Sequence, residues 1–409
     1  MKKTITVLGL GYIGLPTALL LARAGYQVFG FDIDKNHIHM LINGVLPFDE
    51  PGLQNLFCHS NVKKNFKPIK AIQHSNFYII AVPTPQRKGE ADLSFIYKAL
   101  NIIRPVVKDG DMVVLESTVG PLDCEKRIIP QIKKFRKKIG FAHCPERAIP
   151  GNTLHEMVHN PRIIGGLSAK DAVVMKKVYA SFVQGEIYLT HHTLAAVTKV
   201  MENTFRDVNI ALANEFAKIA HEIGIDVWQA IALANKHPRV SILNPGPGVG
   251  GHCIPIDPWF LTAVSKRTNL ILTSRAINDS MPKFVVTQIL DLIKRYKISS
   301  PKIGILGFAY KKNVDDIRET PAEKLSQLLE GTFNVKITDP YVNIADKINS
   351  LEEVLAWCNV LLLVTDHDCY KKISLKKYKQ IKFIYDTRNI LTVKNVFDIP
   401  LYVLGRGGT

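Results

Sequence analysis

The chain has 409 residues, of which 46% are hydrophobic and 22% are charged. These values are ordinary for globular proteins, so they exclude a disordered chain, and the length is sufficient for two or three domains with separate cores. The formal net charge is +17, which suits anionic ligands. Because the lysines stand in scattered groups without interleaved aromatic residues, we expect no nucleic-acid binding.

The sequence lacks targeting and metal-binding signals. No uninterrupted apolar stretch is long enough to span a bilayer, and the N-terminus does not have the pattern of a signal peptide. We therefore expect a cytoplasmic protein without membrane association. The six cysteines show no close pairing and no C-x-x-C motif, which favours a reducing compartment over disulfides or zinc. The pairs His37/His39 and His191/His192 lack partners at metal-ligand spacing, so we expect no metal site.

The first thirty-odd residues have the pattern of a dinucleotide-binding unit. An apolar run at 4–9 leads into Gly9-x-Gly11-x-x-Gly14, then a helical pattern and a strand that ends at Asp32. Gly9 permits a tight turn, Gly11 lets the backbone reach a pyrophosphate, and Gly14 allows the helix to pack on the sheet. A glycine triplet alone also fits any tight turn, but strand, helix and acid are all in register here. Asp32 would accept a hydrogen bond from a ribose 2′-hydroxyl and repel a 2′-phosphate, so the unit favours NAD.

Strands and helices alternate through the first half of the chain. Apolar strands are predicted at 76–85, 111–118, 139–147, 162–166 and 186–190. This alternation predicts a mostly parallel sheet with helices on both faces. Thr84, Thr118 and Glu146 lie at the ends of three of these strands, and ligands bind at the carboxyl ends of the strands in such sheets.

From about residue 191 the pattern becomes helical. The stretch 194–224 has helical periodicity and no proline, which predicts a long central helix. Within it Lys199, Asn203 and Arg206 are spaced i, i+4, i+7, so they share one face. Such a row suits an anionic or oxyanionic group, and a solvent-facing polar stripe is the alternative.

A second α/β pattern starts near residue 301, with strands at 334–340, 359–367 and 381–388. Thr320-Pro321-Ala322-Glu323 predicts a capping box at a helix start. The glycine signature is looser than the first, so we expect a nucleotide other than NAD. The predicted domains are 1–190 (NAD-binding, Rossmann-like), 191–298 (helical, with the cysteine loop) and 299–409 (Rossmann-like).

One cysteine stands behind a glycine-rich loop in the segment 237–260. Four glycines fall within six positions ahead of Cys253, and Asp257 follows it by four residues. A thiolate presented on such a loop can attack a carbonyl carbon and carry an acyl group. The alternative is a buried, inert cysteine, with Asp257-Pro258 as a simple helix start.

Motifs along nearly the whole chain resemble one enzyme family. They are GLGYIGLP, AVPTP, EST, CPER, KVMENTFRDVNIALANE, ANKHPRV, NPGPGVGGHCIPIDPWF, GFAYKKNVDDIRET and YDTRN. In this order they are similar to the UDP-glucose / UDP-N-acetylmannosamine dehydrogenase family. HPRV ahead of PGPGVGGHC resembles the UDP-N-acetyl-D-mannosamine branch. The resemblance implies an α/β fold in which two Rossmann-like doubly wound domains are joined by a long central helix and a helical dimerisation domain.

The resemblance also implies a reaction. NAD would oxidise the C6 alcohol of UDP-N-acetyl-D-mannosamine to a carboxylate in two steps, making a precursor of cell-surface polysaccharide. Cys253 would attack the intermediate aldehyde and carry a thiohemiacetal and then a thioester. By the family's pattern, Lys199 acts as acid and base and stabilises oxyanions together with Asn203. Asp257 and Thr118 would organise a water, and Glu146 would assist hydrolysis of the thioester.

Ligand-binding positions carry over in the same way. Positions that match NAD contacts are Tyr12, Ile13, Asp32, Thr84, Thr118 and Arg318. Positions that match contacts to the UDP-sugar are Arg147, Ala148, Lys199, Asn203, Arg206, His237, Arg239, Gly250, Tyr310 and Lys311. In the family the arginine at position 239 reaches the neighbouring subunit's site, which implies a homodimer or a higher homo-oligomer.

The chain departs from the family pattern at two places. Arg388 stands where many relatives have lysine, so a substrate-binding positive charge persists with changed geometry. The segment VGPLD after Thr118 is shorter than in some relatives, which leaves the water-positioning loop open. UDP-N-acetylglucosamine and UDP-glucose are alternative substrates. A single-step dehydrogenase without a need for Cys253, or a non-catalytic NAD-responsive or nucleic-acid-binding protein, are the alternatives of a different class.

Overall fold

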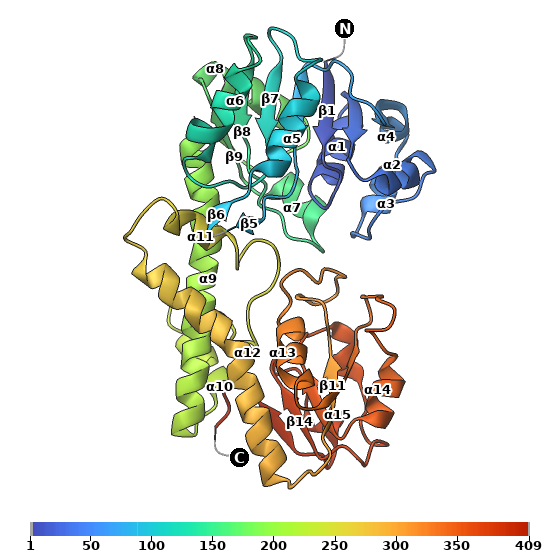
Figure 1. Cartoon of the computed structure of the whole chain (residues 1–409), viewed down its shortest axis with the longest axis vertical. Coiled ribbons are helices and arrows are strands. Elements are labelled where there is room, and N and C mark those ends of the chain that lie inside the picture. Colours follow the sequence, from blue (N-terminus) through green and yellow to red (C-terminus); the bar gives the residue numbers. More distant parts are fainter. Residues whose placement is uncertain (1–2, 88, 408–409) are drawn as a thin grey trace. The chain divides into compact units, whose positions relative to one another are not determined.

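The computed structural model describes residues 3–87 and 89–407 (Figure 1). They divide into two compact units. One comprises Met1–Glu202 with Trp259–Lys266, and the other Asn203–Pro258 with Arg267–Thr409. The three-domain division drawn from the sequence stays a prediction.

Eight strands of the first unit form one sheet in the order β10-β9-β8-β7-β4-β1-β2-β3. They are β1 (Thr4–Leu8), β2 (Gln27–Phe31), β3 (Phe66–Pro68), β4 (Phe77–Ile80), β7 (Met112–Leu115), β8 (Gly140–His143), β9 (Arg162–Gly166) and β10 (Ile187–His191). Neighbours are parallel except for β8 and β9. The residues of β4 and β7 are all buried, as expected for strands covered on both faces. A two-stranded hairpin, β5 (Gln86–Arg87) and β6 (Glu90–Ala91), stands outside this sheet.

Helices flank this sheet (Figure 1). They are α1 (Gly14–Arg23), α2 (Lys35–Ile42), α3 (Leu53–Phe57), α4 (Ser60–Asn65), α5 (Ser94–Ile103), α6 (Ile129–Lys133), α7 (Thr153–His159) and α8 (Ala169–Tyr179), with a π-helical turn at Cys124–Ile128. Every residue of α1 except Arg23 is buried, since small and aliphatic side chains let it lie directly on the sheet. The first turn of α1 therefore has a fixed position above the glycine-rich loop.

The segment between the two sheets in the sequence, residues 192–295, forms helices. They are α9 (His192–Ile223), α10 (Val227–Ala234), α11 (Asp257–Thr262) and α12 (Asn269–Arg295). The long helix predicted from the sequence is confirmed as α9. Asp226 caps α10 by accepting from the backbone N–H groups of Trp228 and Gln229. No helix of the described residues is long and apolar enough to cross a bilayer.

The second unit contains an all-parallel sheet in the order β12-β11-β13-β14-β15. Its elements are β11 (Lys302–Leu306), α13 (Pro321–Glu330), β12 (Asn334–Thr338), α14 (Leu351–Trp357), β13 (Val360–Leu363), a 3-10 turn (Asp368–Lys372), β14 (Phe383–Asp386), α15 (Val393–Val396) and β15 (Leu401–Val403). Two parallel-sheet α/β units and a long helix are thus the observed architecture, as the sequence predicted.

The predicted capping box at α13 is wrong in one of its two parts. Thr320 caps the helix by accepting from the N–H of Ala322, and Pro321 occupies the first helical position. Glu323 does not reach back to the cap, because its carboxylate pairs with Lys347 and accepts from Gln327. A positive partner on a neighbouring segment is more favourable for this carboxylate than a neutral backbone N–H.

Candidate active site

The glycine-rich loop after β1 is shaped by its outer two glycines. Gly9 has φ +90°, a conformation that favours glycine. A Cβ on Gly14 would lie 1.8 Å from the carbonyl oxygen of Gly9, so the helix start and the turn touch directly. A Cβ on Gly11 would meet nothing within 4 Å. Gly11 is therefore not required for packing, and the open space above it fits a ligand that approaches the backbone.

Asp32 and Thr84 stand at the ends of strands beside this loop. Asp32 accepts from the N–H of Leu10 at 2.7 Å and from the N–H of Asp34 at 2.9 Å, which fixes its carboxylate. The hydroxyl of Thr84 is buried and has no hydrogen-bond partner among the described residues. A buried polar atom without a partner is unfavourable, so this hydroxyl fits a ligand that would complete it. Together with the open Gly11 and the N-terminus of α1, these residues fit NAD.

Tyr12, Ile13 and Thr118 complete the predicted cofactor set in the first unit. Tyr12 stacks on Phe48 with ring centroids 4.4 Å apart, and Ile13 is the N-cap of α1. Thr118 follows β7 and is half-buried, and the preceding Ser117 donates its hydroxyl to the carbonyl of Val82 at 2.7 Å.

In the second unit an aspartate follows strand β12, as Asp32 follows β2 in the first unit, but its carboxylate has different hydrogen-bond partners. Asp339 follows β12 and is buried; one of its carboxylate oxygens accepts from the N–H groups of Phe308 (2.6 Å) and Ala309 (2.8 Å). The same oxygen lies 2.9 Å from His367 Nε2. Its other oxygen accepts from the N–H groups of Tyr341 (2.8 Å) and Val342 (3.1 Å). Five protein groups thus share the Asp339 carboxylate, whereas two backbone N–H groups hold that of Asp32. This difference fits the expectation that the domain binds a nucleotide other than NAD.

Glu146 lies in a buried ionic group with Arg162 and Glu116. Arg162 pairs with Glu146, lies 3.5 Å from Glu116 Oε1 and stacks over the ring of Tyr179. Burial opposes the ionisation of Glu146. Arg162 and the N–H groups of Arg147 and Ala148 outweigh that effect, so the pKa of Glu146 is lowered. Glu146 is therefore a fixed anion at neutral pH.

Glu116 behaves in the opposite way. Burial raises the pKa of Glu116 to about 7, although Arg162 and the hydroxyls of Tyr179 and Thr17 act against the rise. Tyr179 donates to Glu116 at 2.7 Å and Thr17 at 3.1 Å. Neighbouring carboxylates in one buried group thus differ strongly in their readiness to ionise.

Arg147 is held in place by other protein groups. Its Nε and Nη2 atoms donate to the two carboxylate oxygens of Glu202 at 3.0 and 2.6 Å, and Nη1 donates to the carbonyl of Pro161 at 2.8 Å. Such a bidentate pair fixes the plane of a guanidinium. Ala148, also a predicted contact, donates its N–H to Glu146.

The predicted row on α9 is partly buried. Lys199 and Asn203 are 8% and 6% exposed, whereas Arg206 is exposed. The amide of Asn203 donates to Asp257 Oδ2 at 2.6 Å. A solvent-facing polar stripe is therefore the wrong interpretation for Lys199 and Asn203.

Cys253 sits in a turn that brings Asp257 back beside it. The N–H groups of Ile256 and Asp257 donate to the carbonyl of Cys253 at 3.1 and 2.8 Å. Cys253 is exposed, so the alternative of a buried cysteine is wrong. Asp257 is the first residue of α11 and its carboxylate is held by Asn203. The structure thus joins three predicted catalytic positions, Cys253, Asp257 and Asn203.

The loop before Cys253 packs against Tyr310 too closely for any residue but glycine. A Cβ on Gly250 would lie 2.7 Å from Tyr310 Cβ, and Gly251 has φ +88° with its Cα facing the Tyr310 ring. Burial, with Asp316 and Cys253, raises the pKa of Tyr310 to about 12, while Arg318 and Arg206 act in the opposite direction. Asp316, Arg318 and Arg206 thus lie close enough to Tyr310 to affect its ionisation.

Arg318 forms a bidentate pair with Asp316, with Nε–Oδ1 at 2.9 Å and Nη2–Oδ2 at 2.6 Å. Its carbonyl accepts from the N–H of Gly251 at 2.8 Å. Burial, followed by Arg318, lowers the pKa of His252. Lys311, a predicted substrate contact, is half-buried beside Tyr310.

The remaining predicted substrate residues lie on two other segments. Arg388 donates Nε to the carbonyl of Val364 at 3.0 Å, and a Cβ on Gly246 would lie 2.7 Å from its Nη1. Arg388 therefore touches the cysteine loop. His237 and Arg239 are both exposed, on the segment after α10.

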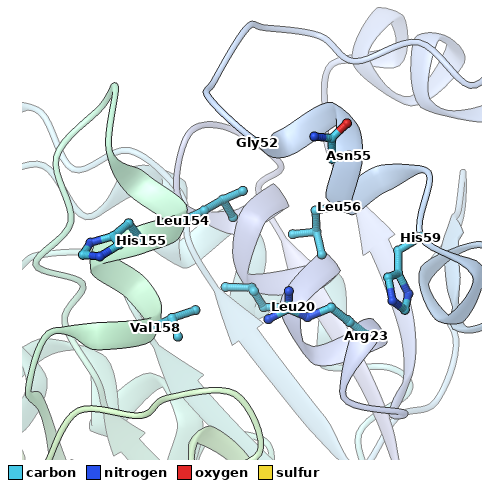
Figure 2. Close-up of a pocket in the computed structure, with 9 residues that line it drawn as sticks. All are labelled: Leu20, Arg23, Gly52, Asn55, Leu56, His59, Leu154, His155 and Val158. Carbon is cyan, nitrogen blue, oxygen red and sulfur yellow. The ribbon is translucent and has the colours of Figure 1, made fainter.

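A cavity of about 340 Å³ lies elsewhere, between α1, α3 and α7 of the first unit (Figure 2). It is lined by Leu20, Arg23, Gly52, Asn55, Leu56, His59, Leu154, His155 and Val158. Leu20 and Arg23 belong to the last turns of α1, whereas the glycine-rich loop precedes its first turn. The cavity is therefore not part of the predicted site.

Sequence reasoning missed the residues that orient the predicted ones. Glu202 fixes Arg147, Arg162 fixes Glu146, and Asp316 fixes Arg318. For Asp316, the position two residues before Arg318 is a usable signal. Glu202 and Arg162 are 55 and 16 residues from their partners, so no local pattern indicates them.

Family models match three segments in chain order. These are the NAD binding domain of the UDP-glucose/GDP-mannose dehydrogenase family at residues 3–183, its central domain at 193–280 and its UDP binding domain at 304–393. The chain belongs to this family. Its members of known name and structure indicate an NAD-dependent oxidoreductase of nucleotide sugars.

Individual relatives are similar over their whole length. A UDP-N-acetyl-D-mannosamine dehydrogenase of Methanococcus aeolicus is 45% identical over 404 residues, 97% of this chain and 92% of the relative. The structure of UDP-D-ManNAc dehydrogenase from Pyrococcus horikoshii superposes with a TM-score of 0.93 at 39% identity, covering 99% of this chain and 100% of the other. The UDP-N-acetyl-mannosamine dehydrogenase of Staphylococcus aureus gives a TM-score of 0.90 at 39% identity, covering 98% and 99%.

Proposed function

We propose that this UDP-sugar dehydrogenase oxidises the C6 alcohol of UDP-N-acetyl-D-mannosamine to the carboxylate through a covalent intermediate on Cys253. The observation that carries the proposal is the turn that places an exposed thiol beside Asp257, whose carboxylate is fixed by Asn203. A single-step oxidation of an alcohol to a ketone or aldehyde needs no thiol. A four-electron oxidation can use one, because a covalent bond to the thiol retains the aldehyde between the two oxidations.

Cys253 acts between the two oxidations. NAD, when bound by the Gly9–Gly14 loop, Asp32 and Thr84, accepts a hydride in each of them. The Cys253 thiolate adds to the aldehyde carbon, and the carbonyl oxygen takes up a proton, which gives a thiohemiacetal. Loss of a hydride from that carbon and of a proton from its hydroxyl oxygen leaves a thioester, and water then releases the carboxylate and the free thiol.

Lys199 and Asn203 act on the oxygen at C6. They lie one turn apart on α9, and an ammonium and an amide N–H both donate to an oxyanion. Lys199, as the neutral amine, takes the proton of the C6 hydroxyl in the first step, and the ammonium so formed donates to the oxygen and returns the proton when the thiolate adds. Asn203 already donates one N–H to Asp257, which leaves its second N–H for the oxyanion.

Hydrolysis of the thioester uses a water organised by Asp257 and Thr118 and assisted by Glu146. Arg162 and two backbone N–H groups keep Glu146 ionised. A fixed anion of this kind orients a water and stabilises the positive charge that develops as the water attacks.

The amount of NADH formed per sugar nucleotide tests this mechanism. We expect two NADH per UDP-N-acetyl-D-mannosamine for the wild type, and no complete turnover for Cys253→Ser. Cys369→Ser, at another exposed cysteine, is the matched control and should keep two. One NADH per sugar at a rate independent of Cys253 would overturn the thioester route.

The names of the relatives support the sugar assignment. UDP-N-acetylglucosamine and UDP-glucose serve as alternative substrates in the same assay, and a higher kcat/KM for either would overturn it. The product is an acidic sugar nucleotide of the kind used for cell-surface polysaccharide.

A homodimer is the second part of the proposal. One face of α9 exposes six apolar side chains at spacings of seven or four: Leu194, Met201, Phe205, Leu212, Ile219 and Ile223. This is the repeat of a helix that packs against another helix, and a second copy of α9 presents the same seam. The exposed Arg239 would then complete the partner's site.

Mixed dimers test the shared site. Arg239→Ala and Cys253→Ser subunits, each inactive alone, are co-expressed with different tags and purified through both. If Arg239 acts in the partner's site, one site of each mixed dimer has both groups and regains activity. Inactive mixed dimers would show that Arg239 does not act across subunits, and a monomeric wild type would overturn the dimer itself.

A further inference from the structure

A row of buried polar side chains joins α9, α12 and the cysteine loop within the second unit. Asn278 donates Nδ2 to Asp207 Oδ1 at 2.8 Å and to the Asp207 carbonyl at 3.0 Å. Asn214 donates Nδ2 to Asn278 Oδ1 at 2.8 Å, and the N–H of Gly246 donates to Asn214 Oδ1 at 2.9 Å. Arg275 holds the other end through Asp207 Oδ1 at 2.5 Å. All four side chains are at most 2% exposed.

The two ends of the row fix the orientation of both amides. The carbonyl of Asp207 only accepts, so Asn278 must direct its NH₂ group to that end and its oxygen to Asn214. The N–H of Gly246 only donates, so Asn214 must direct its oxygen to the loop and its NH₂ group to Asn278. Only one orientation of the two amides gives both of them partners, although Asp207 Oδ2 and Arg275 Nε, at the far end of the row, have none among the described residues. The two amides are therefore held rigidly, because reorienting either one leaves a further polar atom without a partner.

The loop is held again a few residues later. The N–H of Gly251 donates to the carbonyl of Arg318 at 2.8 Å, and a Cβ on Gly248 would contact Pro282 and Pro321 at 3.4 Å. Cys253 follows the second attachment by two residues. The position of the thiol thus depends on attachments at both Gly246 and Gly251.

We propose that Asn214 and Asn278 are positioning residues that hold the Cys253 loop at Gly246, so that the thiol captures the aldehyde before it escapes. This inference rests on the proposed role of Cys253. Asn214 contacts the loop directly, and Asn278 acts only through Asn214. Neither side chain touches the reacting atoms.

Hydrogen exchange tests the attachment without any reference to activity. Asn214→Leu replaces the amide by an apolar group of similar size, and the backbone N–H of Gly246 loses its acceptor. We expect exchange of this amide, followed by mass spectrometry of peptides covering 244–253, to become at least about tenfold faster. Asn278→Leu should give a smaller increase. The double variant should exchange no faster than Asn214→Leu, because both substitutions interrupt one connection. The double variant removes both amides, so neither is left buried without its partner. It therefore serves as the second variant if a single substitution unfolds the protein.

Release of the aldehyde intermediate tests whether a loosened loop captures it less efficiently. With the sugar nucleotide that the wild type oxidises, a loosened loop should release part of the aldehyde, trapped with hydroxylamine, and lower the NADH yield from two towards one. The KM for NAD should not change. Asn65→Leu is the control: Asn65 is also buried, at 5% exposure, donates to the Ala22 carbonyl at 3.1 Å and lies in the first unit. It should lower the melting temperature and leave the NADH yield at two.

The possible results distinguish a failure of this inference from a failure of the proposed function. Unchanged exchange at Gly246 in Asn214→Leu would overturn the attachment itself. Faster exchange with a yield that stays at two and an unchanged kcat would overturn the positioning role. A wild-type yield of one NADH would overturn the proposed function of Cys253, whatever the exchange shows.

Discussion

Asn203 and Asp257 are joined by a hydrogen bond of 2.6 Å between Nδ2 and Oδ2, although they are 54 residues apart in the sequence. Both side chains are buried, at 6% and 3% exposure. The bond ties the long helix α9 to the start of α11, directly after the turn that contains Cys253. It also gives the pair a direction, because the amide donates and the carboxylate accepts.

The direction of this bond leads to the first prediction. Asn203→Asp places two carboxylates in contact, which cannot both ionise readily, and removes the N–H that we propose for the oxyanion. We expect kcat at pH 8 to fall at least about 100-fold. The swap Asn203→Asp/Asp257→Asn restores a donor and an acceptor, so its melting temperature should return towards that of the wild type. Its kcat should not return. Recovery of kcat in the swap would show that the pair is only structural.

The glycine-rich loop gives a contrast between two neighbouring substitutions. Gly11→Ala meets no protein atom within 4 Å, whereas the Cβ of Gly14→Ala would lie 1.8 Å from a carbonyl oxygen. We expect Gly11→Ala to melt at the wild-type temperature while its Kd for NAD rises at least about tenfold. Gly14→Ala should lose stability and NAD binding together. Calorimetric titration with NAD and thermal melting distinguish the two; an unchanged Kd in Gly11→Ala would contradict the placement of the pyrophosphate.

Thr84 gives a prediction with a matched control. Its buried hydroxyl has no partner among the described residues, whereas the buried hydroxyl of Thr17 donates to Glu116 at 3.1 Å. Thr84→Val should therefore leave stability unchanged or slightly raised and weaken NAD binding by about 1 kcal/mol. Thr17→Val should lower the free energy of unfolding by about 1 kcal/mol. If Thr84→Val binds NAD as the wild type does, the hydroxyl is not a cofactor contact.

Glu116 predicts a pH dependence of stability. Burial raises the pKa of Glu116 from 4.5 to about 7. Between these values the folded carboxyl keeps a proton that the unfolded one has released. Stability from this group is therefore lost as the pH rises through that window, by about 3 kcal/mol in full.

Glu116→Gln is neutral at every pH, so its stability relative to the wild type should increase from pH 5 to pH 8. Melting temperatures of both proteins at the two pH values measure this difference. The exposed Glu352, whose pKa is lowered by Lys377, is the control, since Glu352→Gln should gain nothing with rising pH. A difference between Glu116→Gln and the wild type that is constant with pH would contradict the raised pKa.

Much of the architecture was predictable because it follows from local patterns. The run 4–9, the glycines and Asp32 form a unit whose geometry is set by neighbours in sequence, and in the structure Asp32 lies against this turn and accepts from the N–H of Leu10. The 3.6-residue periodicity over 194–224 predicted α9 because a helix is a local structure. The four glycines ahead of Cys253 predicted a backbone that bends sharply or approaches a ligand closely, and the structure packs Gly250 and Gly251 of this loop against Tyr310.

Spacing and residue type in the sequence were sufficient to predict the two α/β units, the long helix and the dinucleotide turn. For Cys253 and Asp257 they left two interpretations open, and the resemblance to a family favoured the catalytic one. Which charged side chains pair with each other depends on the tertiary structure. The pairing of Glu146 with Arg162, of Arg147 with Glu202 and of Glu323 with Lys347 depends on strands and loops that are brought together by packing. The same holds for the link from Asn278 through Asn214 to Gly246, whose members are 64 and 32 residues apart. Buried polar groups must find partners wherever the fold provides them, and sequence distance carries no information about that choice.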